Sequence, residues 1–72
     1  MREEVMRLIE EVLAIPEGTI NENTMMSDVE EWDSLAHVMI IGTLEERMGI
    51  SIALDEAIEI KGMQDLFVKA GI

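Results

Sequence analysis

The chain has 72 residues, enough for one small domain with a thin hydrophobic core, and we expect residues 1–72 to form a single domain. It contains no cysteine and one histidine, so disulfides, cysteine-ligated metals and multi-histidine metal sites are excluded, and no metal site is expected. Sixteen acidic and five basic residues give a net charge of −11. This charge argues against nucleic acid or an anionic membrane surface as partners and favours proteins with basic docking patches.

The first predicted element is an amphipathic helix over residues 2–14. Its apolar residues recur at the spacing of a single helix face: Val5, Leu8, Ile9, Val12 and Leu13. Pro16 disfavours helical geometry at Ile15, so we expect this helix to stop near Ala14.

A long polar loop is predicted over residues 16–33. Ser27 and Glu30 have the spacing of a capping box, which allows one helical turn inside the loop. Trp32, at the end of the loop, is expected to anchor it onto the core. Loops of this length in a small domain are often functional.

The second helix is predicted from Ser34 to Met48. Asp33 is a suitable N-cap, and Gly49 suits the position just after the last turn. This helix is apolar nearly all round, and a domain this small cannot bury every side. We predict that its core stripe is Val38 or Ile41 with Leu44 and Met48. Leu35 and Met39 are expected at the surface, and Ile40 fits either environment.

The rest of the chain predicts a connector and two further helices. Residues 50–54 alternate like an extended segment that buries Ile50, Ile52 and Leu54. A short helix is predicted over residues 55–60, capped by Asp55. After Gly62, a last helix is marked by the apolar spacing from Met63 to Ala70 and closed by Lys69 and Gly71. The predicted fold is therefore an all-α, small four-helix bundle with a long first loop.

Ser34 is the most informative residue of this pattern. A serine at the start of a helix is exposed and lies next to the positive end of the helix dipole, where free backbone N–H groups favour an anion. This is a suitable place for a phosphate ester. The alternative is that Ser34 only caps the helix.

The acidic helical start, the long loop, Asp33-Ser34-Leu35 and Leu44-Glu45-Glu46 together resemble the acyl carrier protein family. Its members are small four-helix modules that carry acyl or aminoacyl groups on a 4′-phosphopantetheine arm. The resemblance covers nearly all of the chain. It implies a covalent phosphopantetheine on Ser34, with Asp33 and Leu35 completing the attachment motif, in a carrier that is not an enzyme.

Asp33, Ser34 and His37 invite a second interpretation, a hydrolytic triad. A triad needs an acid that orients the histidine and an oxyanion hole, and three groups on one exposed turn cannot also enclose a substrate. No catalytic residue is therefore predicted. We expect His37 to line the base of the arm or to touch a partner, with a plain surface histidine as the alternative.

The resemblance also implies the partners: a phosphopantetheinyl transferase, and acyl or aminoacyl ligases, acyltransferases or synthases. We expect the partner-binding residues to be Leu35 and Met39, which supply apolar contact, and Glu45 and Glu46, which supply electrostatic steering. Fatty-acid carriers tend to place acids soon after the serine, where this chain has Ala36 and Met39. This departure favours a dedicated fatty-acid, polyketide or related biosynthetic pathway.

Two alternatives remain open on the sequence alone. An aminoacyl or peptidyl carrier would share the fold and the attachment, and an unmodified acidic adaptor would present the second helix as a docking surface. The chain start lacks the features of a signal peptide, and the longest apolar run, Val38 to Ile41, is too short to cross a bilayer. We therefore expect a cytoplasmic monomer without membrane insertion.

Overall fold

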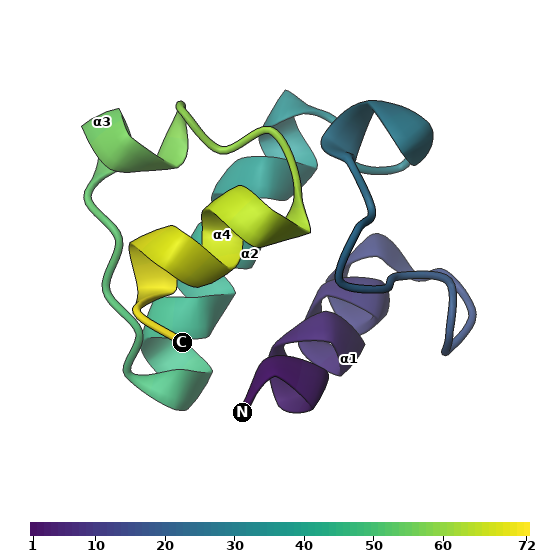
Figure 1. Ribbon diagram of the computed structural model, residues 1–72, viewed down its shortest axis with the longest axis horizontal. Coiled ribbons are helices and arrows are strands. Elements are labelled where there is room, and N and C mark those ends of the chain that lie inside the picture. The colour runs from purple at the N-terminus through teal and green to yellow at the C-terminus, as the bar shows by residue number, and fades with distance from the viewer.

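Four α-helices and one turn of 3-10 helix make up the regular structure in the computed structural model, which describes all of residues 1–72 (Figure 1). The elements in chain order are α1 (Arg2–Leu13), η1 (Met26–Asp28), α2 (Ser34–Met48), α3 (Leu54–Ala57) and α4 (Met63–Ala70). There is no β-strand, so the predicted all-α four-helix fold with a long first loop is confirmed. No helix is both long enough and apolar enough to span a membrane.

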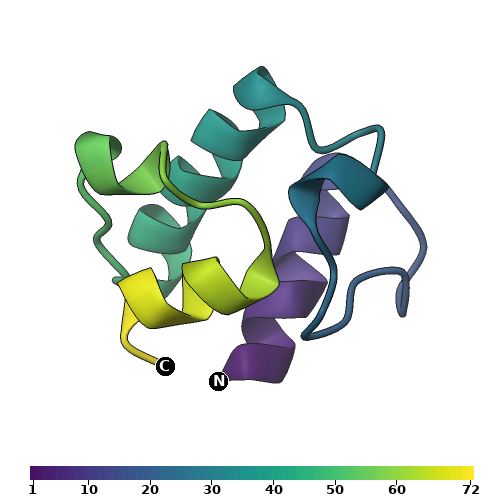
Figure 2. The ribbon, with the colours of Figure 1, turned by 45° about the horizontal axis from the view of Figure 1, so that its top comes forward.

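The helix ends follow the predicted signals at three of the four helices. α1 ends at Leu13 with Ala14 as its left-handed C-cap, and α2 has Asp33 and Gly49 as its caps. α4 ends in a left-handed Gly71. Arg2 Nη2 donates a hydrogen bond of 2.9 Å to the carbonyl oxygen of Ile72, so the two chain ends lie together, as Figure 2 shows.

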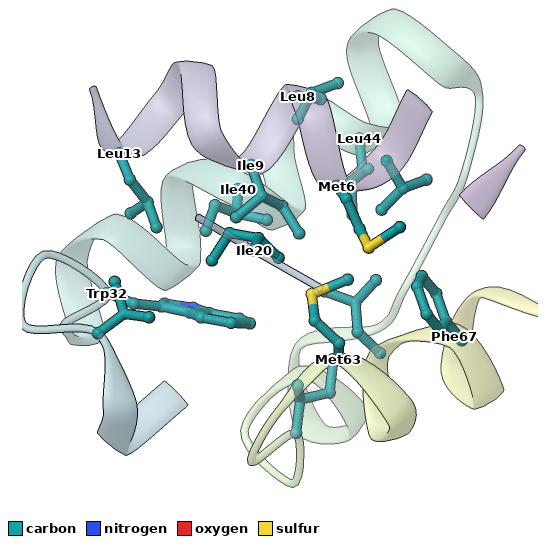
Figure 3. Packing of buried hydrophobic residues seen from close by; sticks show 14 of the residues in the cluster. Met6, Leu8, Ile9, Leu13, Ile20, Trp32, Ile40, Leu44, Met63 and Phe67 are labelled. Atoms are coloured by element: carbon teal, nitrogen blue, oxygen red, sulfur yellow. The ribbon is translucent and has the colours of Figure 1, made fainter. Parts of the chain in front are cut away.

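The core lies between α1, α2 and α4 and is closed by the first loop. Figure 3 shows Ile9 of α1 facing Ile40 of α2, with Met63 and Phe67 of α4 below them and Trp32 entering from the loop. All five side chains are at most 2 % exposed. The amphipathic face predicted for the first helix therefore supplies one wall of this core.

A buried carboxylate holds the first loop to α1. Glu10 is 2 % exposed, and its Oε2 accepts hydrogen bonds from the backbone N–H groups of Gly18 at 2.9 Å and Ile20 at 2.8 Å. Its Oε1 lies 2.9 Å from Arg7 Nε. A buried charge is tolerated when it is paired and hydrogen-bonded. Here Oε2 is hydrogen-bonded, and Oε1 is ion-paired with Arg7 at a distance that lacks hydrogen-bond geometry. The loop is thereby fixed early, before it reaches η1.

Two predictions about local capping were wrong. The helical turn inside the loop is present, but its cap is Asp28 Oδ2, which accepts from the N–H of Met25 at 3.2 Å, and not the pair Ser27 and Glu30. α3 begins at Leu54 and ends at Ala57, and no side chain caps it. Leu54, expected to be buried, is 68 % exposed, because the extended alternation stops where this helix begins.

The buried face of α2 also differs from the prediction. Its buried residues are His37, Ile40 and Leu44, whereas Val38 is 56 % exposed. Leu35 and Met39 are exposed, as predicted. The periodicity of a helix that is apolar all round does not determine which face is buried. The face that is buried here includes His37, whose hydrogen bonds are described below.

Backbone hydrogen bonds tie the first loop to the segment between α3 and α4. The N–H of Met26 donates to the carbonyl oxygen of Lys61 at 2.8 Å, and the N–H of Met63 donates to that of Thr24 at 2.9 Å. A side chain on Gly62 would place its Cβ 2.8 Å from the carbonyl oxygen of Thr24. This position therefore requires glycine, because two backbone segments approach each other closely.

An ion-pair cluster joins α3 and its following turn to α4. Lys69 Nζ lies 2.9 Å from Glu56 Oε1 and 2.8 Å from Glu59 Oε1. The hydrogen bond and positive charge of Lys69 hold the pKa of the Glu59 carboxyl below its ordinary value of 4.5. The hydrogen bonds to Glu56 and Glu59 raise the pKa of Lys69 above 10.5.

These shifts predict a pH window for the Lys69 cluster. Glu59 has a lowered pKa, so its contribution to stability is present above pH 4.5 and is lost as pH falls through its folded-state pKa. Lys69 has a raised pKa, so its contribution is fully present below pH 10.5 and is lost as pH rises through its folded-state pKa. We expect Lys69→Gln to lower the melting temperature between these limits, and this difference from wild type to shrink at more acidic and more alkaline pH.

The matched control is Lys61→Gln, which removes the same charge from a side chain without an ion-pair partner. Melting curves of both variants and the wild type across pH give the comparison. A Lys69→Gln effect that is constant with pH, or that Lys61→Gln reproduces, contradicts the assigned role of the cluster.

Candidate functional site

Ser34 is the first residue of α2, and its hydroxyl group is free. Asp33 Oδ1 accepts a hydrogen bond of 2.9 Å from the N–H of Ala36 and so caps the helix. The side chain of Ser34 is exposed and forms no hydrogen bond with the protein. Since Asp33 performs the capping, the interpretation of Ser34 as a mere cap is not supported. The arrangement fits a covalent group that reaches the serine from solvent.

An apolar groove of about 470 Å³ lies on one side of Ser34, between α2 and α3. Aliphatic side chains make up most of its lining: Val38, Ile41, Ile52, Leu54, Ile58 and Ile60. Three polar residues also line it, Ser34, His37 and Lys61. The groove therefore offers an apolar volume directly beside the serine.

A second hollow of about 380 Å³ lies on the loop side of Ser34. Its lining is more polar and comes from the loop and the end of the α3–α4 segment: Met25, Met26, Ser27, Trp32, Asp33, Ser34 and Lys61. Ser34 and Lys61 line both cavities. The serine thus stands where the two hollows meet.

His37 is buried and connects three segments around Ser34. Its Nδ1 lies 3.0 Å from Trp32 Nε1, and its Nε2 lies 2.9 Å from the carbonyl oxygen of Ala57. An indole N–H can only donate, so Nδ1 accepts and Nε2 carries the proton that is donated to Ala57. The surface-histidine alternative was wrong. The prediction that Trp32 anchors the loop is confirmed, since its side chain is 2 % exposed.

The geometry does not assemble a hydrolytic triad. The Asp33 carboxylate caps α2, and both ring nitrogens of His37 are occupied by Trp32 and Ala57. Neither group is therefore positioned to activate the Ser34 hydroxyl. No group of three or more histidine, cysteine or acidic side chains is placed to hold a metal ion.

The residues expected to bind partners lie at the surface of α2. Leu35 is 72 % exposed and Met39 is 53 % exposed, both within the first two turns after Asp33. Glu45 and Glu46 are exposed near the other end of the helix. The apolar face near Ser34 is wider than the sequence predicted, because Val38 belongs to it as well.

Lys61 and the α3 side of the groove were not predicted from the sequence. Leu54 and Ile58 are each 68 % exposed at the groove, although the sequence pattern placed Leu54 in the interior. Only the fold brings Lys61 into the lining of the two hollows that Ser34 also lines. The only feature of the sequence that pointed to Lys61 was weak: it is one of five basic residues in a strongly acidic chain.

Comparisons with known proteins agree with this site. Residues 3–66 match the family model described as "Phosphopantetheine attachment site". The chain is similar to the solution NMR structure of a holo acyl carrier protein from Geobacter metallireducens, with 26% sequence identity, a TM-score of 0.83, and coverage of 97% of this chain and 80% of that one. No match was found among curated proteins. The chain therefore belongs to the acyl carrier family, carriers rather than catalysts that bear a covalently attached 4′-phosphopantetheine.

Proposed function

We propose that this protein carries acyl intermediates on a 4′-phosphopantetheine attached to Ser34 and delivers them to partner enzymes of a biosynthetic pathway. The observation that carries this proposal is the free, exposed hydroxyl of Ser34 at the start of α2, between the two hollows. Asp33 and Leu35 flank it in the attachment motif. When bound, the arm supplies a terminal thiol that holds the cargo as a thioester.

The chain itself needs to do little in the attachment. The start of α2 presents unpaired backbone N–H groups and the positive end of the helix dipole to a phosphate on Ser34. Asp33 fixes this helix start through its bond to Ala36. Because Asp33 and His37 are both engaged in hydrogen bonds, the base that activates the Ser34 hydroxyl must come from the phosphopantetheinyl transferase.

The groove between α2 and α3 favours an acyl cargo over an aminoacyl one. Its walls are largely aliphatic, and burial of each methylene stabilises a bound chain by about 0.8 kcal/mol. An α-amino group would lose hydration there without gaining a charged partner, since no acidic residue lines the groove. For this reason we rank an aminoacyl or peptidyl carrier below an acyl carrier.

The exposed surface of α2 favours partners that dock through apolar contact near Ser34. Leu35 and Met39 provide this contact, and no acidic residue occurs between Asp33 and Glu45. Glu45 and Glu46 would steer a basic patch toward the far end. We therefore propose transferase, ligase, acyltransferase or synthase partners in a specialised fatty-acid, polyketide or related pathway. We place this carrier in the cytoplasm as a monomer, with residues 1–72 as one carrier domain.

The attachment predicts a single modification. Incubation with coenzyme A and a broad-specificity phosphopantetheinyl transferase is expected to add one phosphopantetheine, measured by intact mass and located on Ser34 by peptide mapping. Ser34→Ala is expected to abolish the gain while leaving helical content unchanged, because its hydroxyl forms no hydrogen bond within the fold. Modification of Ser27 or Ser51, or no modification of the folded wild type, would refute the assignment and favour the adaptor alternative.

If α2 is the docking surface, a negative charge introduced near Ser34 is expected to weaken docking of the transferase. Met39→Glu is expected to lower kcat/KM of the transferase about tenfold, because an apolar contact is lost and a charge is desolvated at the interface. Stability is expected to change by less than about 0.5 kcal/mol, since Met39 is 53 % exposed. Charge reversal at Glu45 and Glu46 is expected to act on the association rate and its salt dependence.

Val68→Glu is the matched control for Met39→Glu. Val68 is an exposed apolar residue of α4, 76 % exposed, and the substitution introduces the same charge on a different helix. Equal loss of transferase activity in both variants would show that the effect is global and that α2 is not the docking surface. Unfolding of Met39→Glu would instead mean that Met39 belongs to the core.

A further inference from the structure

Four of the five basic side chains are engaged in ion pairs, and Lys61 is the exception. The pairs are Arg2–Glu22 at 3.1 Å, Arg7–Glu10 at 2.9 Å, Arg47–Glu11 at 3.1 Å and Lys69–Glu56 at 2.9 Å. In a chain with sixteen acidic residues, an exposed lysine without a carboxylate within 4.0 Å is unexpected. Its ammonium group is the one side-chain cation left free to meet an external anion.

Lys61 is also the only basic residue of the two hollows that meet at Ser34. It lines the apolar groove and the polar hollow, as Ser34 does. Its backbone is fixed at both polar atoms: the carbonyl oxygen accepts from the N–H of Met26 at 2.8 Å, and the N–H donates to Asp65 Oδ2 at 2.9 Å. The flexible stem of the lysine therefore starts from a fixed backbone position in the lining of both hollows.

The proposed modification creates an anion at this place. A phosphodiester on Ser34 adds a negative charge directly after Asp33, in a chain whose net charge is already −11. The backbone N–H groups at the start of α2 favour this anion, whereas the Asp33 carboxylate repels it. A free ammonium group that lines the same hollows is the natural counter-charge, and lysine binds phosphate as a compact point charge.

We infer that Lys61 binds the phosphodiester of the arm on Ser34 through its Nζ, an inference that rests on the proposed attachment at Ser34. The ion pair holds the first segment of the arm where the two hollows meet. This place borders the apolar groove between α2 and α3, which we propose favours an acyl cargo. The ion pair also lowers the electrostatic cost of placing a phosphate next to Asp33. A partner enzyme with basic groups competes with Lys61 for the phosphate and so releases the arm when it docks.

The test is a thermodynamic cycle between modification and Lys61. Apo and holo forms of wild type, Lys61→Gln and Lys61→Arg are prepared, and intact mass establishes complete conversion of each holo sample. The melting temperature of each form is then measured at low ionic strength. In Lys61→Gln, we expect the apo-to-holo change to be less favourable than in wild type by about 1–5 °C, the size of one exposed ion pair in a domain of this length. Lys61→Arg is expected to retain the wild-type change.

Three further measurements make the assignment specific to the phosphate. Lys69→Gln removes the same charge but lies in the α3–α4 cluster, so its effect is expected to be equal in apo and holo protein. The ³¹P resonance of the holo protein is expected to shift in Lys61→Gln and not in Lys69→Gln. The difference between wild type and Lys61→Gln is expected to fall as salt is added.

The outcomes separate this inference from the proposed function. Complete conversion at Ser34 with equal apo-to-holo changes in wild type and Lys61→Gln overturns the role of Lys61 and leaves the carrier assignment intact. The same result follows if Lys69→Gln reproduces the effect of Lys61→Gln. Failure of the wild type to gain the arm overturns the proposed attachment, and the inference about Lys61 falls with it.

Discussion

The side chain of His37 makes the contacts on which the surroundings of Ser34 depend. One ring nitrogen accepts from the Trp32 indole and the other donates to the carbonyl oxygen of Ala57, so a single buried residue of α2 holds both the preceding loop and α3. Loss of the imidazole would leave the buried Trp32 N–H without a partner, at a cost of about 1–3 kcal/mol, and would remove one of the two hydrogen bonds that the Ala57 carbonyl oxygen accepts. In a domain with so thin a core, that cost is a large fraction of the total stability.

Acidic charge and exposed apolar side chains are both present at the surface, as suits a carrier that docks to partner enzymes. Acidic residues give the chain its net charge of −11, and four of the five basic side chains form ion pairs with acidic ones. Around Ser34, exposed apolar side chains of α2 and α3 surround the groove. Long-range attraction and short-range contact therefore come from different kinds of side chain.

Much of the fold could be predicted from local signals. Pro16, Asp33, Gly49 and Gly71 mark helix ends through their own backbone or side-chain properties, and α1, α2 and α4 begin or end there as predicted. Ser34 was found through its motif and its place at a helix start. α3 was misplaced, because four residues without a side-chain cap leave little pattern.

The remaining errors depend on contacts between distant segments. α2 is apolar on all sides, so no periodicity shows that Val38 faces solvent. The burial of His37 depends on Ala57, twenty residues away, and the two hollows exist only once α3 and the first loop are in place. NMR of the His37 ring nitrogens and of hydrogen exchange at Trp32 Nε1 tests this account most directly. It predicts a neutral ring with its proton on Nε2 and a protected indole N–H, whereas a proton on Nδ1, or indole exchange as fast as in free tryptophan, would contradict it.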